Sequence, residues 1–185
     1  MALRLPRLIP RLAVKGKNVV VTVQMEGLRV VGNAADLALT YAEDADEIFY
    51  FDCVASLYGH THLEELLEQT VTDVFVPVTV GGGIRSLADI RRLLAAGADK
   101  VAINSAAIRT PSLINQAADR VGSQAIAVAI EAKRLGSQWE ALYESGRQRS
   151  GLDAIAWAQE AARRCAGEIL LTSIDREGTR RGFYV

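Results

Sequence analysis

Three consecutive glycines follow an apolar run in the segment 76–86 and are the first candidates for ligand binding. The run VPVTV before them is apolar throughout and rich in β-branched residues, which is typical of a strand buried in a parallel sheet. Glycines at the end of such a strand let the backbone approach a ligand, and a helix starting near Ser86 would add N–H groups for an anion. Gly82 and Gly83 therefore predict a phosphate-binding loop, with a tight turn as an equally good interpretation of the glycines alone.

Further polar residues stand at the ends of other apolar runs. They are Asp52, Asn104, Ser105, Glu131 and Asp175. An open doubly wound sheet concentrates its ligand-binding residues at one switch point, whereas a barrel gathers all its strand ends in one mouth. Because these residues follow several different strands, the sequence favours a barrel.

Apolar runs of strand length alternate with helical patterns, which indicates a parallel α/β fold. The expected strands cover residues 7–14, 48–54, 74–80, 101–104, 124–131 and 168–174, and the expected helices 34–43, 61–72, 87–96, 112–120 and 153–164. A short ribbon is expected at 19–24, and residues 138–143 followed by Gly146 indicate a small hairpin. A (βα)8 barrel usually needs about 200–250 residues. With six strands in 185 residues, we expect one truncated (βα)8-barrel domain over 1–185 that lacks the last two βα units.

The ends of the first and fifth expected strands resemble each other. Residues 12–15 and 130–133 both contain hydrophobic residues, one variable position and a final lysine. This echo predicts two related half-barrels, the first at about 1–122 and the second starting within 123–185. Side chains alternate along a strand, so if Arg7 points into the barrel, Arg11 and Ala13 point inward as well.

A charged residue comes directly before four of the apolar strands. These residues are Arg7, Glu47, Lys100 and Glu168. In a barrel the four positions face one another at the N-terminal floor, where two cations and two anions would neutralise one another. The alternative is a set of ordinary surface charges at loop ends.

The composition excludes several classes of protein. Half of the residues are hydrophobic and the net charge is −1, which argues against nucleic acid or a membrane surface as the main partner. No apolar run approaches the roughly 20 residues of a membrane helix, and no signal peptide is recognisable. Two distant cysteines and two histidines offer no metal-binding spacing, so we expect no metal, no cofactor and a cytoplasmic location.

Several motifs together resemble the HisF family, the cyclase subunits of imidazole glycerol phosphate synthase. The motifs are RLIP at 7–10, ADE at 45–47, FD at 51–52, TVGGGIR at 79–85, GADKVAINSAA at 97–107, GSQ at 122–124, VAIEAKR at 128–134 and AGEILLTSIDREGT at 166–179. The resemblance implies a (βα)8 barrel with a glutaminase partner docked on its floor. Ammonia from that partner would pass the charged gate of Arg7, Glu47, Lys100 and Glu168.

The resemblance also implies a substrate and its binding site. The family substrate is a phosphoribulosyl-formimino aminoimidazole carboxamide ribotide, which carries a phosphate at each end. Its first phosphate site corresponds to Gly82, Gly83, Asn104 and Ser105, where Ser105 replaces the usual Thr. Backbone N–H groups and a hydroxyl suit such an anion. Asp52 and Asp175 are expected to shape the wall of the mouth.

The chain departs from the family pattern at the chemical centre. The two catalytic aspartates of the family correspond to Ala13, which can neither donate nor accept a proton, and to Glu131, which keeps a carboxyl group. The loop lysine corresponds to Val21, and an aspartate near the second phosphate to Glu177. Arg11 replaces a small residue, and as a cation inside the barrel it is expected to contact Glu131.

These departures leave three functions open: the cyclase reaction, a HisF-like protein that delivers ammonia for the amidination of sugars, and a truncated pseudoenzyme. Open edges at the first and sixth strands predict self-association of the isolated chain. His60 and His62 are expected to be solvated, Cys53 to pack as a small apolar residue, and Trp157 to lie in the core. Trp139 is expected either to cover the site or to pack at the surface.

Overall fold

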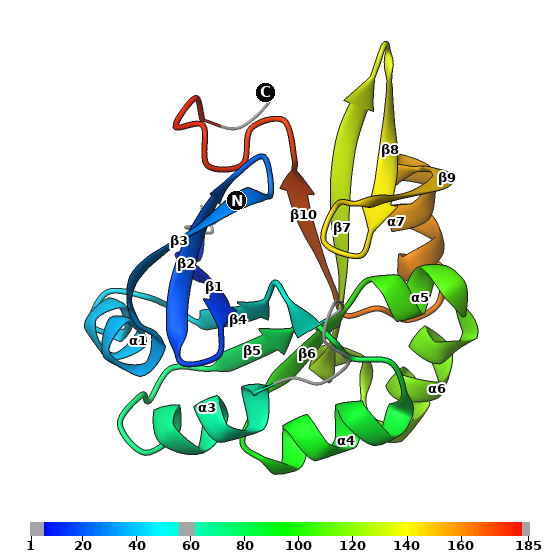
Figure 1. Ribbon diagram of the computed structural model, residues 1–185. Coiled ribbons are helices and arrows are strands. Elements are labelled where there is room, and N and C mark those ends of the chain that lie inside the picture. The colour runs from blue at the N-terminus through cyan, green and yellow to red at the C-terminus, as the bar shows by residue number, and fades with distance from the viewer. Residues whose placement is uncertain (1–5, 56–61, 183–185) are drawn as a thin grey trace, which may run out of the picture.

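The computed structural model describes residues 6–55 and 62–182, which form a curved, mostly parallel sheet with helices on its outer face (Figure 1). Six of the strands in these ranges run parallel, in the order β1, β4, β5, β6, β7 and β10. Their bounds are Arg11–Lys15, Ile48–Asp52, Val78–Gly81, Lys100–Ile103, Ile126–Leu135 and Glu168–Ser173. The sheet is a partial (βα)8 barrel, as the sequence predicted.

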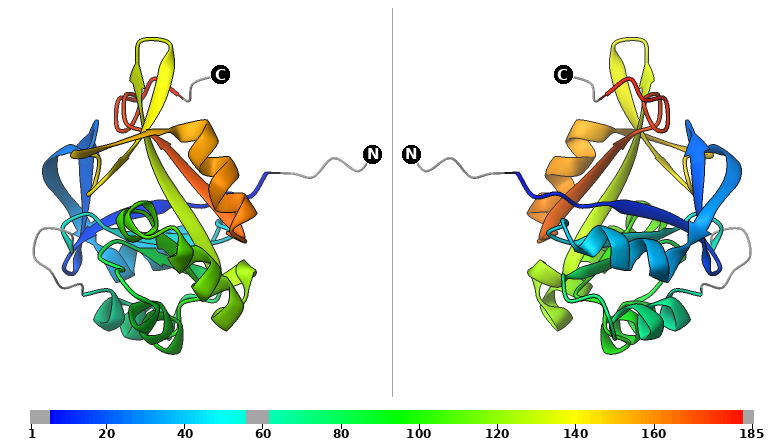
Figure 2. Two further views of the ribbon diagram at one scale, coloured as in Figure 1. Left: turned by 90° about the vertical axis from the view of Figure 1, so that its right-hand side faces the viewer. Right: turned by 90° about the vertical axis from the view of Figure 1, so that its left-hand side faces the viewer.

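An antiparallel hairpin extends the sheet at two places. Strands β2 (Asn18–Val23) and β3 (Glu26–Asn33) add to β1, and strands β8 (Gln138–Tyr143) and β9 (Gln148–Asp153) add to β7. The connection between β7 and β8 projects well beyond the body of the molecule (Figure 2).

Polar caps begin three of the helices. Asn33 caps α1 (Ala34–Ala42) and Asp153 caps α7 (Ala154–Arg163), each through a side-chain oxygen that accepts two backbone N–H bonds. Ser86 and Asp89 form a capping box at the start of α4 (Leu87–Ala95). Other helices within residues 6–55 and 62–182 are α3 (Leu63–Thr70), α5 (Ser105–Arg109), α6 (Ser112–Val121) and the 3-10 turn η1 (Ser123–Ala125).

Alternating side chains divide the interior into two apolar clusters. The larger cluster lies between the outer face of the sheet and the helices and includes Tyr50, Val128 and Trp157. The smaller cluster fills the inner face with Phe49, Phe51, Ala102 and Ala127. The inward direction of Arg11 is confirmed, because its guanidinium carbon lies 4.4 Å from the centroid of the Phe51 ring.

The predicted elements agree with the structure except for some element boundaries and for segments in which apolar and polar residues do not alternate regularly. Strand β3 was not predicted, because seven of its eight residues are exposed and they show no apolar alternation. The first expected strand begins at Arg11 rather than residue 7, and the third at Val78 rather than residue 74. The short helix α5 was also missed. Residue 61, the start of the expected helix 61–72, and His60 lie outside the described residues.

Within residues 6–55 and 62–182, no helix is long and apolar enough to cross a membrane. The same residues contain no group of three or more His, Cys, Asp or Glu side chains placed to hold a metal ion.

Candidate active site

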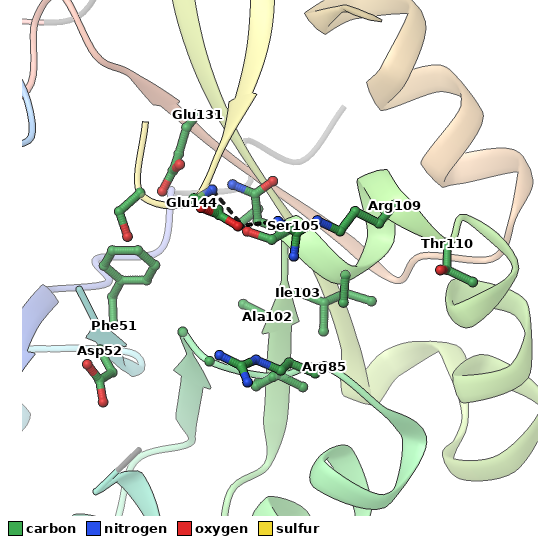
Figure 3. A pocket seen from close by; sticks show the side chains of 17 residues that line it. Phe51, Asp52, Arg85, Ala102, Ile103, Ser105, Arg109, Thr110, Glu131 and Glu144 are labelled. Atoms are coloured by element: carbon green, nitrogen blue, oxygen red, sulfur yellow. Dashed lines mark hydrogen bonds and ion pairs between the residues drawn. The ribbon is translucent and has the colours of Figure 1, made fainter. Parts of the chain in front are cut away.

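A pocket of about 330 Å³ opens at the C-terminal ends of the parallel strands. It is lined by the ends of β4, β5, β6 and β7, by the glycine loop, by α5 and by the turn between β8 and β9. Figure 3 shows Glu131, Glu144, Ser105 and Arg109 along one side of this pocket and Arg85 on the other. The structure thus brings Gly82, Gly83, Asn104, Ser105, Asp52 and Glu131 together around one cavity.

The glycine loop has the backbone that its sequence requires. Gly82 and Gly83 have φ angles of +99° and +73°, a region that other residues rarely adopt. A Cβ atom on Gly82 would lie 2.2 Å from the carbonyl oxygen of Asp52, so this glycine also allows close packing against β4. The loop therefore stands at the pocket wall with its backbone close to any ligand.

Helix α4, which follows this loop, offers fewer free N–H groups to an anion than the sequence suggested. The carboxylate of Asp89 accepts the N–H groups of Arg85 and Ser86 at 3.1 and 2.9 Å, and Ser86 Oγ accepts the Asp89 N–H. The capping box therefore already uses the N–H groups of Arg85, Ser86 and Asp89, and these three are not free for an anion. A phosphate at this loop would depend on the glycine backbone and on the facing side chains.

Asn104 and Ser105 lie at the end of β6, where they hold the neighbouring hairpin. The Asn104 amide donates to the Leu142 carbonyl at 3.2 Å, while its buried Oδ1 has no hydrogen-bond partner. Ser105 Oγ accepts the Glu144 N–H at 3.0 Å. The Ser105 hydroxyl can still donate its proton, so both residues keep one polar group for a ligand.

Glu131 is the buried carboxyl group of the site, with 2% of its surface exposed. Its Oε2 accepts the Gly146 N–H at 2.7 Å. Burial raises the pKa of Glu131 to about 7, against the lowering effect of Arg11 and of the Gly146 hydrogen bond. The group therefore exists in both protonation states near neutral pH, as a general acid or base requires.

Arg11 does not form the expected ion pair with Glu131. Its Nη1 donates to Thr172 Oγ1 at 2.9 Å and its guanidinium lies over Phe51, so a hydroxyl and an aromatic face hold the cation. Thr172 is the ladder partner of Glu131 on β10, and the two charges still affect each other's pKa. Burial lowers the pKa of Arg11, with Glu131 opposing this.

Ala13, the other candidate catalytic position, faces a different cavity. This cavity of about 990 Å³ lies between β1, the β2–β3 hairpin, α1 and residues 177–180, and Val21 also lines it. Ala13 is the third of the five residues of β1 and pairs with Phe51 of β4 in the ladder. Its methyl group offers no proton for chemistry.

The predicted wall residues Asp52 and Asp175, and the further candidate Glu177, have local structural roles. Asp52 Oδ1 accepts the N–H groups of Val54 and Ala55, and Asp175 Oδ2 accepts the Arg134 N–H at 2.9 Å. The Glu177 carboxylate accepts Thr22 Oγ1 at 2.6 Å and the Met25 N–H at 2.8 Å, which ties the β2–β3 turn to the C-terminal segment. Of the three, Asp52 lines the pocket with Glu131, and Glu177 lines the second cavity.

The turn between β8 and β9 brings two residues to the pocket, Glu144 and Ser145, that were not predicted as site residues. Glu144 forms an ion pair with Arg109, and Ser145 Oγ donates to the Cys53 carbonyl at 3.3 Å. These residues belong to a polar connection whose sequence carries no apolar periodicity. A glycine at position 146, with a φ of +75°, was the one available sign of a tight turn.

The four floor charges form a closed ring at the other end of the barrel. The Arg7 guanidinium contacts the carboxylates of Glu47 and Glu168 at 3.1 and 3.0 Å, and Lys100 Nζ contacts the same two at 2.8 Å each. Thr79 Oγ1 donates to the second oxygen of Glu47 at 2.5 Å. The interpretation as unrelated surface charges is wrong, because every member of the ring touches both members of opposite charge.

The ring fixes the charge states of its members. Burial opposes ionisation of Glu168, but hydrogen bonds from Lys100 and Arg7 lower its pKa below the usual value. Burial also disfavours the charged form of Lys100, yet the hydrogen bonds to Glu168 and Glu47 raise its pKa. These contacts therefore favour the charged forms of Glu168 and Lys100.

The remaining residues singled out in the sequence are not among those that line the pocket. Trp157 is 4% exposed in the larger core, and Trp139 packs partly buried against the same core rather than over the pocket. Cys53 packs in the inner cluster, its thiol 3.3 Å from the Val14 carbonyl, and burial raises the pKa of that thiol. His62 is half-exposed at the start of α3, with its Nδ1 3.9 Å from the Glu65 carboxylate.

Comparisons with known proteins agree with this geometry. A profile of the family described as histidine biosynthesis protein matches residues 7–185. The imidazole glycerol phosphate synthase subunit HisF of Legionella pneumophila is 53% identical over 179 residues, which are 96% of this chain and 84% of the relative. The protein of the same name from Myxococcus xanthus (strain DK1622) is 49% identical over 178 residues, which are 96% of this chain and 70% of the relative. Both names describe a subunit of a larger enzyme.

Proposed function

The chain belongs to the histidine biosynthesis protein family and, within it, to the HisF subunits, and on this premise we propose that it is the cyclase subunit of an imidazole glycerol phosphate synthase. It would use ammonia to convert the phosphoribulosyl-formimino aminoimidazole carboxamide ribotide to imidazole glycerol phosphate, a step of histidine biosynthesis. The observation that carries this proposal is that the charged ring and Glu131 lie on the same inner face of the sheet. Glu47, Lys100 and Glu168 stand at one end of that face and Glu131 at the other.

Glu131 is the proposed catalytic residue. A carboxyl group with a pKa of about 7 can take a proton from ammonium or from the substrate and return it during ring closure. Its position differs from that of an aspartate by one methylene group, and the Gly146 N–H fixes one carboxylate oxygen. Since Ala13 has no ionisable group, Glu131 would perform the proton transfers at the end of the barrel where the family uses two aspartates.

The glycine loop is the proposed site for a substrate phosphate. Gly82 and Gly83 offer backbone N–H groups, Ser105 offers a hydroxyl proton, and Arg85 and Arg109 bring positive charge to the same pocket. No metal or cofactor is needed for this arrangement to hold an anion.

A glutaminase subunit is the proposed partner, docked at the floor of the barrel. The charged ring opens at this end, where ammonia from a second subunit would have to enter. Phe75, which is 90% exposed, precedes β5 at the same end, and Leu8, which is 60% exposed, follows Arg7. Exposed apolar side chains around a polar entrance are typical of an interface.

The free thiols of Cys53 and Cys165 suit the cytoplasm, which is the proposed location of the protein.

The test is ammonia-dependent turnover of the ribotide, with the product identified by mass spectrometry. We expect imidazole glycerol phosphate from the wild-type chain and at least as fast a reaction from Ala13→Asp. Failure of both chains to turn over the ribotide would contradict the proposal. Transfer of ammonia to a sugar instead would establish the second candidate, a HisF-like protein of changed chemistry, which Ala13 specifically favours.

The isolated chain is also proposed to self-associate. Within the described residues β10 pairs only with β7, and Leu171 on β10 is 68% exposed. An open strand edge with an exposed apolar side chain favours pairing with another chain. Sedimentation velocity should show species larger than a monomer, and a single monomeric species at all concentrations would contradict this.

A further inference from the structure

The turn between β8 and β9 connects the phosphate pocket to Glu131 through an unbroken set of contacts. Arg109 on α5 pairs with the carboxylate of Glu144, and its guanidinium lies 5.2 Å from the centroid of the Tyr143 ring. Ser105 Oγ accepts the Glu144 N–H at 3.0 Å. Two residues further along, the Gly146 N–H donates to Glu131 at 2.7 Å. The position of the Gly146 N–H therefore depends on groups that belong to α5.

The groups that hold the turn also face the pocket. Ser105, Arg109 and Glu144 all line the cavity beside Gly82 and Gly83 (Figure 3). In the free protein the Glu144 carboxylate satisfies Arg109. A phosphate bound at the glycine loop would carry more negative charge than this carboxylate and would attract the same guanidinium. Phosphate and Glu144 would then compete for Arg109.

The surroundings of Glu131 show why the turn matters for its protonation. Arg11 on β1 and Arg147 in the turn are the charged groups that face it, with Asn104 from the end of β6 and Thr172 beside it on β10. Arg11 is already held by Thr172 and Phe51. Among the residues that the structure describes, Gly146 makes the shortest hydrogen bond to the carboxylate, so loosening the turn removes a close group that stabilises the anion.

We infer that Arg109 is a positioning residue that couples phosphate binding to the protonation of Glu131. It acts through Glu144, which holds the Gly146 N–H on the Glu131 carboxylate while the pocket is empty. When a phosphate takes Arg109 from Glu144, the turn loosens and Glu131 gains a proton, which prepares it to act as an acid. This coupling rests on the proposed function for the identity of the phosphate ligand but not for the link between Arg109 and Glu131.

The first experiment follows the Glu131 carboxyl group by ¹³C NMR during a pH titration, with Glu131→Gln for assignment. Losing a backbone hydrogen bond to a carboxylate should raise its pKa by about 0.5–1 unit. We expect this rise in Arg109→Met and in Glu144→Gln, a midpoint near the wild-type value in Arg109→Lys, and no change in Arg91→Met, an exposed arginine on α4. An unchanged midpoint in both Arg109→Met and Glu144→Gln would overturn the inference.

The second experiment titrates inorganic phosphate against the Gly82 and Gly83 amide resonances of the same proteins. Arg109→Met should weaken phosphate binding by about tenfold, since a charge-assisted contact is lost. Glu144→Gln should tighten it, because the competing carboxylate is gone. Equal affinities in the two variants would overturn the competition. Absence of binding at the glycines in every protein would refute the proposed phosphate site while leaving the first experiment to decide the link to Glu131.

Discussion

The protein contains two units of the same layout that differ in their chemistry. The first consists of β1, the β2–β3 hairpin and α1, and the second of β7, the β8–β9 hairpin and α7. In each unit a parallel strand continues into an antiparallel hairpin, and an Asn or Asp cap starts the helix. The first strand carries Ala13 and the second carries Glu131, each within the stretch that pairs in parallel with a neighbouring strand.

The hairpin turns of the two units are held in different ways. The turn of the first unit is fixed by Glu177, which lies outside the pocket, and a Cβ atom on Gly178 would meet the Thr22 carbonyl oxygen at 2.0 Å. The turn of the second unit is fixed by groups inside the pocket, Ser105 and Glu131. The comparison indicates that one layout serves as scaffold in the first unit and as part of the site in the second.

Removing the carboxyl group of the second unit should have the largest effect. Glu131→Gln keeps the shape of the side chain but cannot exchange a proton, so ammonia-dependent turnover should fall by about 10²–10⁴-fold. The matched change in the first unit, Ala13→Ser, should alter the rate by less than about tenfold, since no charge is removed. Equal losses in the two variants would show that the units do not differ as described.

Breaking the floor ring tests the part of the barrel that both units share. Lys100→Met leaves the buried Glu47 carboxylate with Arg7 as its one cation and should lower the free energy of unfolding by about 3 kcal/mol. Lys133→Met, at an exposed position on β7, should change it by less than about 0.5 kcal/mol. Urea unfolding of both variants measures the difference, and similar values would contradict a ring that stabilises the fold.

The pH dependence of stability should differ between wild type and Glu131→Gln. Burial raises the folded pKa of Glu131 from 4.5 to about 7, so the folded protein binds this proton more tightly than the unfolded chain does. The resulting stability is fully present below pH 4.5 and is lost as the pH rises through about 7, an effect on the order of 3 kcal/mol. Parallel stability profiles of the two proteins would contradict a raised pKa.

The helix caps should give the smallest effect, and they allow a direct comparison because each unit has one cap of the same kind. Asn33→Ala and Asp153→Ala each remove a side chain that accepts two N–H bonds at a helix start. Each should cost about 1 kcal/mol of unfolding free energy. Thermal unfolding should give similar losses for the two, and a much larger loss for one unit would show that its helix carries more of the fold.

The sequence predicts the parts of the molecule that depend on side-chain type at regular spacing. The floor ring was predictable because Glu47 and Lys100 each precede an apolar strand, so that strand order alone places them at one end. The Asn33 cap is predictable because a helical pattern follows an asparagine at that position. Gly82 and Gly83 were predictable from the strand before them, and the structure places them in the pocket wall.

Contacts that depend on backbone groups or on competing partners could not be predicted. Arg11 was expected to pair with Glu131, but Thr172 and Phe51 hold its guanidinium, and no spacing in the sequence indicates this choice. The Gly146 N–H on Glu131 leaves no trace in side-chain types. The Asp89 cap, by contrast, follows the Ser86 capping pattern and uses the N–H groups of Arg85 and Ser86 at the start of this helix.

The protonation of Glu131 tests the account most directly, because the proposed chemistry depends on a buried carboxyl group of the second unit that titrates near neutrality. Glu140 on β8 is an internal reference, since its hydrogen bonds with Arg149 and the Gly151 N–H lower its pKa. A ¹³C NMR titration of the wild-type protein should give a midpoint for Glu131 of about 7, well above that of Glu140. A midpoint near 4.5 would contradict the assignment of Glu131 as an acid and base in this site.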